Sequence, residues 1–225
     1  MRGAALRAAA LIGGCAALMT ACASTNRQQT VRAGVAINTP AAQARADSGR
    51  PAYTAADVRF MQGMIGHHAQ AIWMARLAPT RGARGDIRTL AERIDVSQRD
   101  EIAFMQRWLR ERRQTVPDPV PQHESPNHQM SMPGMSGPLM PGMLTHEQMM
   151  QLEAAHGAEF DRLFLTFMIQ HHEGALTMVK QLFSSPGAGQ DVYVFRFASD
   201  VEADQTTEID RMQSMLATIT EGRRQ

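Results

Sequence analysis

Thiol groups are nearly absent from this chain of 225 residues. Its two cysteines, Cys15 and Cys22, both lie within the first 22 residues. The rest of the chain therefore cannot build a disulfide framework, a cysteine zinc site or a catalytic thiol. Neither sign of charge is in excess, with 23 Lys+Arg against 22 Asp+Glu, so we expect no basic surface for a phosphate backbone. Nucleic acid is excluded as a partner on this ground.

Aromatic residues are also scarce, at 5%, whereas 17 residues are methionine, more than core packing usually recruits. Long apolar runs are missing beyond residues 8–19, a stretch that follows Arg2 and Arg7 and is too short to span a bilayer. This pattern predicts a signal peptide over residues 1–23 and an exported protein.

Two cleavage patterns fit the end of the predicted signal peptide. Residues 18–22 resemble a bacterial lipobox with Met19 where an aliphatic residue is usual, whereas residues 21–23 fit ordinary A-x-A cleavage. We favour the lipoprotein interpretation, in which Cys22 is lipidated. It predicts a periplasmic or cell-envelope protein that meets the membrane only through its lipid anchor.

Composition and periodicity divide the remaining chain into four parts. Residues 24–52 are rich in Ala, Thr, Gln, Ser and Arg without helical periodicity, which predicts a flexible tether. Apolar residues recur at spacings of three and four in residues 53–114 and again in residues 146–221, which predicts two helical hairpins. Between them, residues 115–145 contain seven prolines and predict a linker rich in Met, His and Pro. The two hairpins are expected to form one domain.

Local signals predict where the helices begin and break. Two capping pairs predict helix starts: Thr54 with Asp57, and Thr145 with Gln148. Asp86 is the expected N-cap of the second helix, and Gly157 predicts a break in the third. Residues 192–195 have the composition of a strand, but a lone strand would have no sheet to join. We therefore expect a last helix over residues 191–220.

An internal repeat relates the two hairpins. The pattern D-x-x-F-x-x-x-M-I-x-H-H-x-x-A-x-x-M occurs at residues 57–74 and again at 161–178, an offset of 104. The second helices of the hairpins also match each other, at an offset of 107. One hairpin cannot bury its apolar face alone, so two equivalent hairpins are expected to pack together. The predicted fold is all-α, a ferritin-like four-helix bundle made of two repeated helical hairpins.

The repeat brings thioether and imidazole groups together on a helix. Met64 is a helical neighbour of His67 and His68, and the second copy has the same arrangement. Imidazole suits several transition metals, whereas thioether sulfur adds affinity only for soft ions, of which an exported protein meets chiefly Cu(I). We therefore expect copper, as Cu(I) or Cu(II). The predicted metal ligands are Met64, His67, His68 and Met74, with Met168, His171, His172 and Met178.

Core packing is the alternative explanation for these residues. Methionines at helical spacing commonly fill a core, and buried histidines commonly form hydrogen bonds between helices. Matched positions on the second helices carry polar residues that would serve as such partners, or as a second shell around a metal: Gln98, Glu101, Gln205 and Glu208. Both explanations stay open at this point.

The predicted linker is a second candidate metal segment. Its methionines and histidines lack the periodicity of core residues, and a flexible string of thioethers can wrap around Cu(I). The alternative is a low-complexity linker that binds nothing. The candidate residues are His123, His128, Met130, Met132, Met135, Met140, Met143 and His146.

Catalytic motifs are not found in the sequence. Glu153-x-x-His156 matches half of a di-metal carboxylate signature, but the first hairpin has no equivalent. The patterns H-E-x-x-H and G-x-S-x-G and a Gly-rich phosphate loop are missing as well. We therefore expect no enzymatic activity.

The doubled motif resembles the bacterial domain of unknown function 305 family. The resemblance is clear at residues 161–175 and at their counterpart in residues 57–74, and it extends over about residues 53–113 and 146–217. Members of this family include CopM-like exported copper-binding proteins. The resemblance implies a ferritin-like four-helix bundle, export, and copper binding through the Met and His residues of the doubled motif. It implies no established enzymatic activity.

These patterns together predict an exported copper-binding protein that sequesters Cu(I) or Cu(II), or hands it on, and so contributes to metal homeostasis of the envelope. The metal ion is the expected partner, and a second copy of the chain or a copper-transfer protein would be further partners. The alternative is a non-catalytic structural or interaction bundle of the envelope, in which the His pairs only crosslink helices.

Overall fold

The computed structural model describes residues 52–120 and 139–222, and the regular structure within these ranges is helical. The four long helices are α2 (Ala55–Leu77), α3 (Gly85–Glu111), α5 (Gly157–Ser184) and α6 (Val192–Gly222). A short helix, α4 (His146–Ala154), precedes α5, and a 3-10 turn, η1 (Ala78–Thr80), follows α2. The predicted all-α four-helix bundle is confirmed. None of the described helices is long and apolar enough to cross a bilayer.

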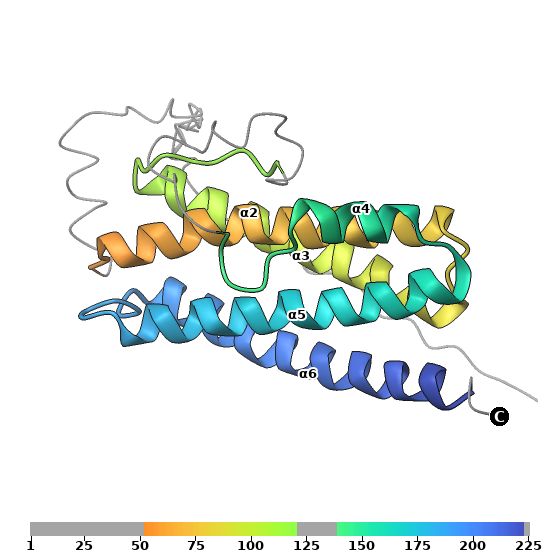
Figure 1. Cartoon of the computed structure of the whole chain (residues 1–225). Helices are drawn as coiled ribbons and strands as arrows, with labels where there is room; N and C mark the ends of the chain where they lie inside the picture. The colour runs from red at the N-terminus through yellow and green to blue at the C-terminus, as the bar shows by residue number, and fades with distance from the viewer. Residues whose placement is uncertain (1–51, 121–138, 223–225) are drawn as a thin grey trace, which may run out of the picture. The chain divides into compact units, whose positions relative to one another are not determined.

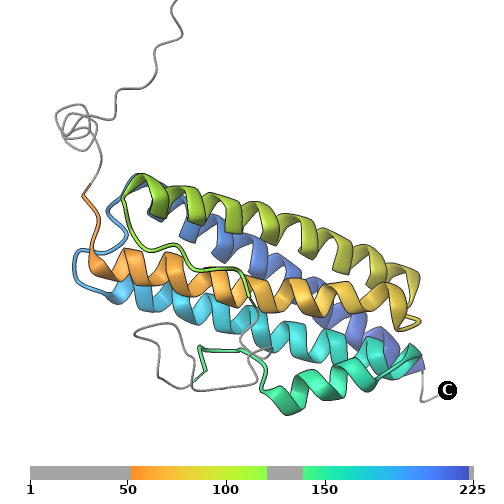
Figure 2. The same ribbon diagram turned by 90° about the horizontal axis from the view of Figure 1, so that it is seen from above.

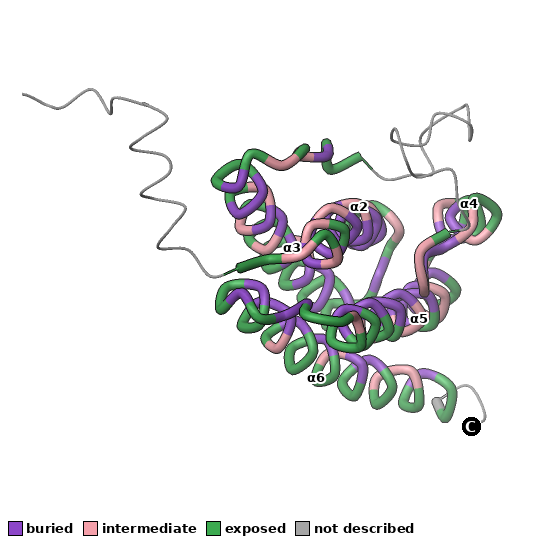
Figure 3. Tube along the Cα trace, turned by 90° about the vertical axis from the view of Figure 1, so that its left-hand side faces the viewer, coloured by how far each residue is buried: buried purple, intermediate pink, exposed green. Residues whose placement is uncertain are grey.

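The two repeats form two helical hairpins. Helix α2 packs along α3, α5 packs along α6, and the hairpins meet where α2 lies against α5 (Figures 1 and 2). In both views α2 and α5 run in opposite directions. Figure 3 shows buried positions on the inner sides of the helices and exposed positions on the outer sides of α3 and α6. The junction between the hairpins is therefore built by the two helices that carry the repeated motif.

Local sequence explains most of the helix boundaries. The Thr54 side chain accepts a hydrogen bond from the Asp57 N–H, and Asp57 accepts one from the Thr54 N–H, so the predicted capping box starts α2. Thr145 and Gln148 form the same box at α4. Gly157 has a φ of 55°, which a glycine adopts without strain, and it permits the predicted break before α5.

The predicted N-cap of α3 is wrong. Helix α3 begins at Gly85 with Arg84 at the N-cap, and Asp86 lies in the first turn, where it pairs with the Arg84 side chain at 3.0 Å. The Arg84 N–H donates to Asp161 Oδ1 on α5 at 3.2 Å. A tertiary hydrogen bond therefore fixes the start of this helix.

A layer of polar side chains divides the hydrophobic core. One apolar cluster contains residues from the first halves of α2 and α6 and from the second halves of α3 and α5. The other cluster contains residues from the opposite halves of the same four helices. Between the clusters, each long helix contributes buried polar residues, and we call this group the polar layer. Its members are His67, His68, Gln98, His171, His172 and Gln205.

Just before α4 the chain crosses α2 and α5 as a short segment, residues 140–144, which we call the strap. Gln70 on α2 bonds Leu144 twice, donating to its carbonyl at 3.1 Å and accepting from its N–H at 2.7 Å. Gln170 on α5 donates to the Gly142 carbonyl at 3.3 Å. A Cβ at Gly174 would lie 2.6 Å from the Gly142 Cα, so the strap requires glycine at this position of α5.

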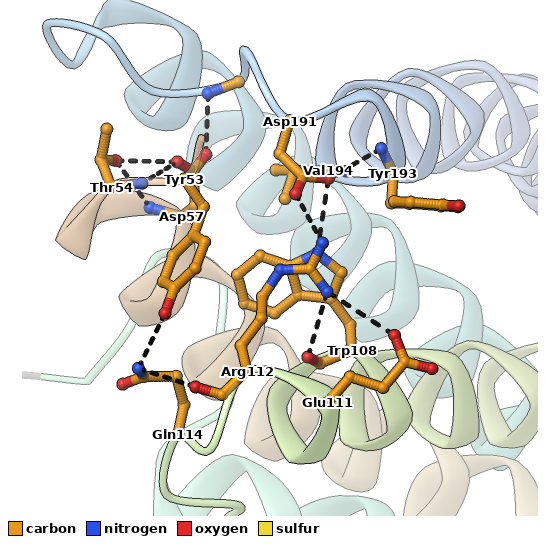
Figure 4. A network of polar contacts seen from close by, with 11 residues as sticks. Tyr53, Thr54, Asp57, Trp108, Glu111, Arg112, Gln114, Asp191, Tyr193 and Val194 are labelled. Atoms are coloured by element: carbon orange, nitrogen blue, oxygen red, sulfur yellow. Dashed lines mark hydrogen bonds and ion pairs between the residues drawn. The ribbon is translucent and has the colours of Figure 1, made fainter. Parts of the chain in front are cut away.

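A buried ion pair joins the end of α3 to the start of α6 (Figure 4). Arg112 Nη2 lies 2.6 Å from Asp191 Oδ2, and the two side chains are 1% and 0% exposed. The guanidinium also lies 4.2 Å from the centre of the Trp108 ring. Asp191 Oδ1 accepts from the N–H groups of Tyr193 and Val194, so the same carboxylate caps α6.

Replacing Gly174 by alanine should displace the strap. The added Cβ would collide with Pro141 and Gly142, and such overpacking costs about 1–3 kcal/mol or more of unfolding free energy. Hydrogen exchange should show faster exchange of the Leu144 N–H. Gly66→Ala is the matched control, because its Cβ would meet only the Met140 methyl, at 3.8 Å. A Gly174→Ala protein as stable as Gly66→Ala would contradict this role of the glycine.

Arg112→Met should destabilise the protein by about 3–5 kcal/mol, because it leaves the Asp191 carboxylate buried without its cation. Urea unfolding measures the loss. Arg162→Met breaks an ion pair whose side chains are 40% and 49% exposed, and it should change the unfolding free energy by about 0–1 kcal/mol. Equal losses in the two variants would refute the importance of burial at this pair.

Candidate metal centre

The four histidines of the repeated motif meet in the polar layer, and all four are fully buried. The ring centroids of His67 and His171 lie 3.9 Å apart, across the junction of α2 and α5. His68 lies 6.4 Å from His67 and His172 lies 6.2 Å from His171, again between centroids. The two His pairs, 104 residues apart in sequence, therefore form one group in the centre of the bundle.

Glutamates of the second helices bind one histidine of each pair. His68 Nε2 lies 2.5 Å from Glu101 Oε2 on α3, and His172 Nε2 lies 2.7 Å from Glu208 Oε2 on α6. A carboxylate can only accept, so Nε2 carries the proton and donates it. These two contacts are equivalent in the two hairpins and link the helices within each.

Backbone carbonyls bind the other histidine of each pair. His171 Nε2 donates to the His67 carbonyl of α2 at 2.9 Å. His67 Nε2 donates to the Pro141 carbonyl of the strap at 3.1 Å. The repeat symmetry is broken here, because the strap supplies the acceptor for His67.

The second ring nitrogen, Nδ1, has no hydrogen-bond partner in the described part of the chain for any of the four histidines. Since each Nε2 holds a ring proton, an imidazole in its neutral form presents a lone pair at Nδ1. The side-chain oxygens of Gln98 and Gln205 are buried without a partner in the same way. Unpaired buried acceptors are costly, and an acceptor-rich layer of this kind is suited to a cation.

Burial keeps the imidazoles of His67 and His171 neutral. Burial, followed by the proximity of His68, lowers the pKa of His67 from its ordinary value of 6.5 to about 3. Burial, followed by the proximity of His67, also holds the pKa of His171 well below 6.5. Neutral imidazole is the form that binds metals, so protons do not compete for the Nδ1 atoms of His67 and His171 near pH 7.

The four helix methionines lie on both sides of the polar layer. Met64 and Met178 belong to one apolar cluster, and Met74 and Met168 belong to the other. None is more than 8% exposed. They therefore pack as core residues, and the cores they fill border the imidazoles.

Part of the predicted linker lies outside the described residues, and so does Cys22. The linker residues concerned are His123, His128, Met130, Met132 and Met135. Within the described part, Met140 is half-buried on the strap, Met143 is buried, and His146 is exposed at the start of α4. The structure thus brings two of the linker methionines onto the bundle.

The described residues do not contain a conventional metal centre of His, Cys, Asp and Glu ligands. No group of three or more His, Cys, Asp and Glu side chains within residues 52–120 and 139–222 is arranged to hold a metal. Glu153, from the half di-metal signature, accepts a hydrogen bond from the Trp73 indole at 3.0 Å. The donors present are the Nδ1 atoms of the polar layer and the thioethers of the two apolar clusters, and nitrogen combined with soft sulfur suits Cu(I).

An acidic groove between α3 and α6 adjoins the centre. Glu101 lines this groove of about 590 Å³ together with Asp100, Asp200 and Asp204. Partial burial raises the pKa of Asp204, and the negative charges of Glu101, Asp200 and Glu208 raise it further. Glu101 is 20% exposed while its partner His68 is fully buried, so this carboxylate joins the groove to the polar layer.

The strap contacts were not predicted from the sequence, although the repeat contains a signal for them. At two positions of the repeat, glycine and glutamine are interchanged: Gly66 of the first copy corresponds to Gln170, and Gln70 corresponds to Gly174. In the structure both glutamines bond the strap, and Gly174 makes room for it. These two differences between the copies therefore lie where the strap crosses α2 and α5.

Solved structures of similar proteins share this fold. A protein from Streptomyces coelicolor, described as secreted, has a TM-score of 0.59 and 27% identity, covering 73% of this chain and 94% of that one. A fragment from Deinococcus radiodurans has a TM-score of 0.58 and 30% identity, covering 75% and 99%. CopM in its Cu(II)-bound form has a TM-score of 0.56 and 25% identity, covering 72% and 96%. CopM is also known in Cu(I)-bound and Ag-bound forms.

Sequence comparison identifies the family. Curated proteins give no match to the chain. Residues 57–216 match the family described as Domain of unknown function (DUF305), and the first two solved relatives carry the same domain. The predicted resemblance is confirmed, and the chain belongs to the DUF305 family.

Proposed function

We propose that this protein is an exported copper-binding protein that holds Cu(I) in the polar layer and sequesters it or hands it on. The observation that carries the proposal is the set of four buried Nδ1 atoms without partners, in His67, His68, His171 and His172. Each belongs to an imidazole whose Nε2 meets a carboxylate or a carbonyl. Histidines that bind metals typically have their other nitrogen anchored in this way.

The donor set favours copper over other metals. Zinc in proteins takes four ligands, and no such cluster of His, Cys, Asp and Glu occurs in residues 52–120 and 139–222. Cu(I) accepts few ligands and favours nitrogen with soft sulfur. In this proposal Met64 and Met74 of the first copy, and Met168 and Met178 of the second, are the thioethers available to complete the coordination of an imidazole-bound ion.

The relatives support the same function. CopM, which shares the fold at 25% identity, has been crystallised with Cu(II). Export is supported by the Streptomyces coelicolor relative described as secreted. For the present chain we propose cleavage of a signal peptide over residues 1–23 and lipidation of Cys22, with the linker methionines and histidines as an outer set of copper ligands.

A structural role for the histidines is the second candidate function. It is favoured by the contacts of His68 with Glu101 and of His172 with Glu208, each of which links the two helices of one hairpin. In that case the histidines would contribute stability, and metal binding would be incidental. The two candidates can be separated by a substitution that keeps the crosslink and removes Nδ1.

Replacement of both His68 and His172 by glutamine should weaken metal binding and leave the fold intact. A glutamine amide can still donate to Glu101 and Glu208, but it has no equivalent of Nδ1. We expect the affinity for Cu(I), measured anaerobically against a competing chelator, to fall about 10- to 100-fold.

Met150→Leu is the control for this experiment, because Met150 is 52% exposed on α4. It should bind Cu(I) as the unsubstituted protein does. If the double glutamine variant kept its full Cu(I) affinity, His68 and His172 would not be ligands and the structural role would stand for these two histidines.

The metal-free protein should lose stability as the pH falls below 6.5. His67 has a pKa of about 3 when folded and His171 one well below 6.5, so the unfolded chain takes up protons that the folded chain does not. The free energy of unfolding should therefore drop by up to about 1.4 kcal/mol per pH unit for each histidine. Urea unfolding between pH 7.5 and 5, of the protein and of His171→Gln, measures it. An identical slope in both proteins would argue against a buried neutral His171.

A further inference from the structure

The exposed aromatic side chains of the bundle gather at one of its ends. Of the twelve aromatic residues, eight are buried or half-buried and four are exposed. In Figures 1 and 2 the start of α2, the end of α5 and the start of α6 lie at the same end of the bundle. The four exposed aromatic residues belong to these segments, as does an exposed valine, and we call this group the aromatic end. Its members are Tyr53, Phe183, Val192, Tyr193 and Phe195.

The rings of the aromatic end are held by neighbours within the bundle. The Arg112 guanidinium lies 5.6 Å from the centre of the Tyr53 ring and 5.9 Å from that of Tyr193 (Figure 4). The centroids of the Phe183 and Phe195 rings lie 5.8 Å apart. These apolar rings therefore face solvent from fixed positions, and a patch of this kind is typical of a contact surface.

Exposed charges at the aromatic end are mostly positive. The five residues of each long helix nearest this end carry five exposed cations and one exposed acid, Glu111, whose carboxylate lies 3.8 Å from Arg112. The cations are Arg59, Arg107, Arg110, Lys180 and Arg196. The five residues at the opposite end of each helix carry two exposed cations and three exposed acids. The aromatic end thus combines apolar rings with positive charge, as surfaces that bind anionic lipid headgroups do.

The chain enters the bundle at the same end. Tyr53 directly precedes the capping box that starts α2, and thirty residues separate it from Cys22. A flexible chain of that length spans about 30 Å on average. Lipidation of Cys22 is part of the function proposed above, and it would keep a bilayer surface within this distance of the aromatic end. A weak contact is then sufficient, because a short tether raises the local concentration of the surface to about the millimolar range.

We propose that the aromatic end docks on the headgroup region of an anionic bilayer and holds the bundle end-on at the membrane surface. The tyrosine and phenylalanine rings enter the interface, and the surrounding cations meet the negative headgroups. From the sequence, membrane contact was expected through the lipid anchor only. The aromatic end adds a second contact from the folded part of the chain, and two weak contacts together bind a membrane more stably than either one.

Vesicle binding by the exported chain without its lipid tests this docking. Residues 22–225 carrying Cys22→Ser are sedimented with vesicles of phosphatidylglycerol and phosphatidylethanolamine, or of phosphatidylcholine alone. We expect binding to the anionic vesicles that weakens as the salt concentration rises. Val192→Ser combined with Phe195→Ser should lower the partition coefficient about 10-fold, because two exposed apolar side chains no longer enter the interface.

Val96→Ser combined with Met150→Ser is the matched control. Val96 and Met150 are 54% and 52% exposed, close to the 48% and 53% of Val192 and Phe195, but they lie on α3 and α4 outside the aromatic end. The control should bind vesicles as well as the Cys22→Ser chain does. All four side chains are exposed, so both variants are expected to fold. Equal binding by the two variants, or no binding to anionic vesicles, would overturn the proposal.

A second copy of the chain is the other occupant that the aromatic end could take. Analytical ultracentrifugation without vesicles distinguishes the two occupants. A monomer is expected for the Cys22→Ser chain. A dimer that Val192→Ser with Phe195→Ser abolishes would overturn docking on the membrane in favour of self-association.

The orientation of the bundle can be measured with the lipidated chain in vesicles that contain a spin-labelled headgroup lipid. The ring resonances of Phe183 and Phe195 should broaden. Phe160 should be unaffected, because it lies about 35 Å from Phe183 along α5. Broadening of Phe160 to the same degree would overturn the end-on docking.

Failure of this proposal can be distinguished from failure of the copper function. The Cys22→Ser chain carries no lipid, so its vesicle binding tests the aromatic end independently of lipidation. The Cu(I) affinity of Val192→Ser with Phe195→Ser should equal that of the unsubstituted protein, because neither residue belongs to the polar layer. Loss of Cu(I) binding in this variant would overturn the separation of the aromatic end from the metal centre.

Discussion

The burial of four imidazoles between two apolar clusters is the constraint on which the remaining structure depends. A buried ring N–H without an acceptor is costly, so each Nε2 must meet one. The acceptors come from four different segments: Glu101 on α3, Glu208 on α6, the His67 carbonyl on α2, and the Pro141 carbonyl on the strap. Helix register within each hairpin, the packing of α2 on α5 and the path of the strap are therefore fixed by the same set of hydrogen bonds.

The strap turns a nearly symmetric pair of hairpins into an asymmetric molecule. In a symmetric junction, His67 would bond α5 as His171 bonds α2, but its partner is the strap. The exchange of Gly66 and Gln70 for Gln170 and Gly174 suits this path, since each helix offers a glutamine that bonds the strap, and Gly174 lets the strap pass close to α5. One face of the polar layer is thereby covered by linker residues, and the other adjoins the acidic groove through Glu101.

Much of the fold could be predicted because its signals are local or repeated. The repeat, the capping boxes at Thr54 and Thr145 and the break at Gly157 all appear in the structure as expected. The start of α3 was missed because its determinant is a bond from the Arg84 N–H to Asp161, 77 residues away. The orientation of the imidazoles could not be predicted for the same reason. Acceptors from distant segments determine which ring nitrogen is left without a partner, and helical spacing carries no information about those acceptors.

Charge balance in the polar layer bears on which copper ion the bundle would hold. Burial holds His67 and His171 neutral, and the fixed charges in the layer are the carboxylates of Glu101 and Glu208, which lie against Nε2 of His68 and His172. A monovalent ion on Nδ1 would be balanced through the ring by one carboxylate, as in the carboxylate–histidine–metal arrangement. A divalent ion at one such nitrogen would leave a net charge between two apolar clusters, at a large desolvation cost. The two glutamates therefore orient the rings and also limit the charge that the core accommodates, so the copper function proposed above is expected to favour a monovalent ion inside the bundle.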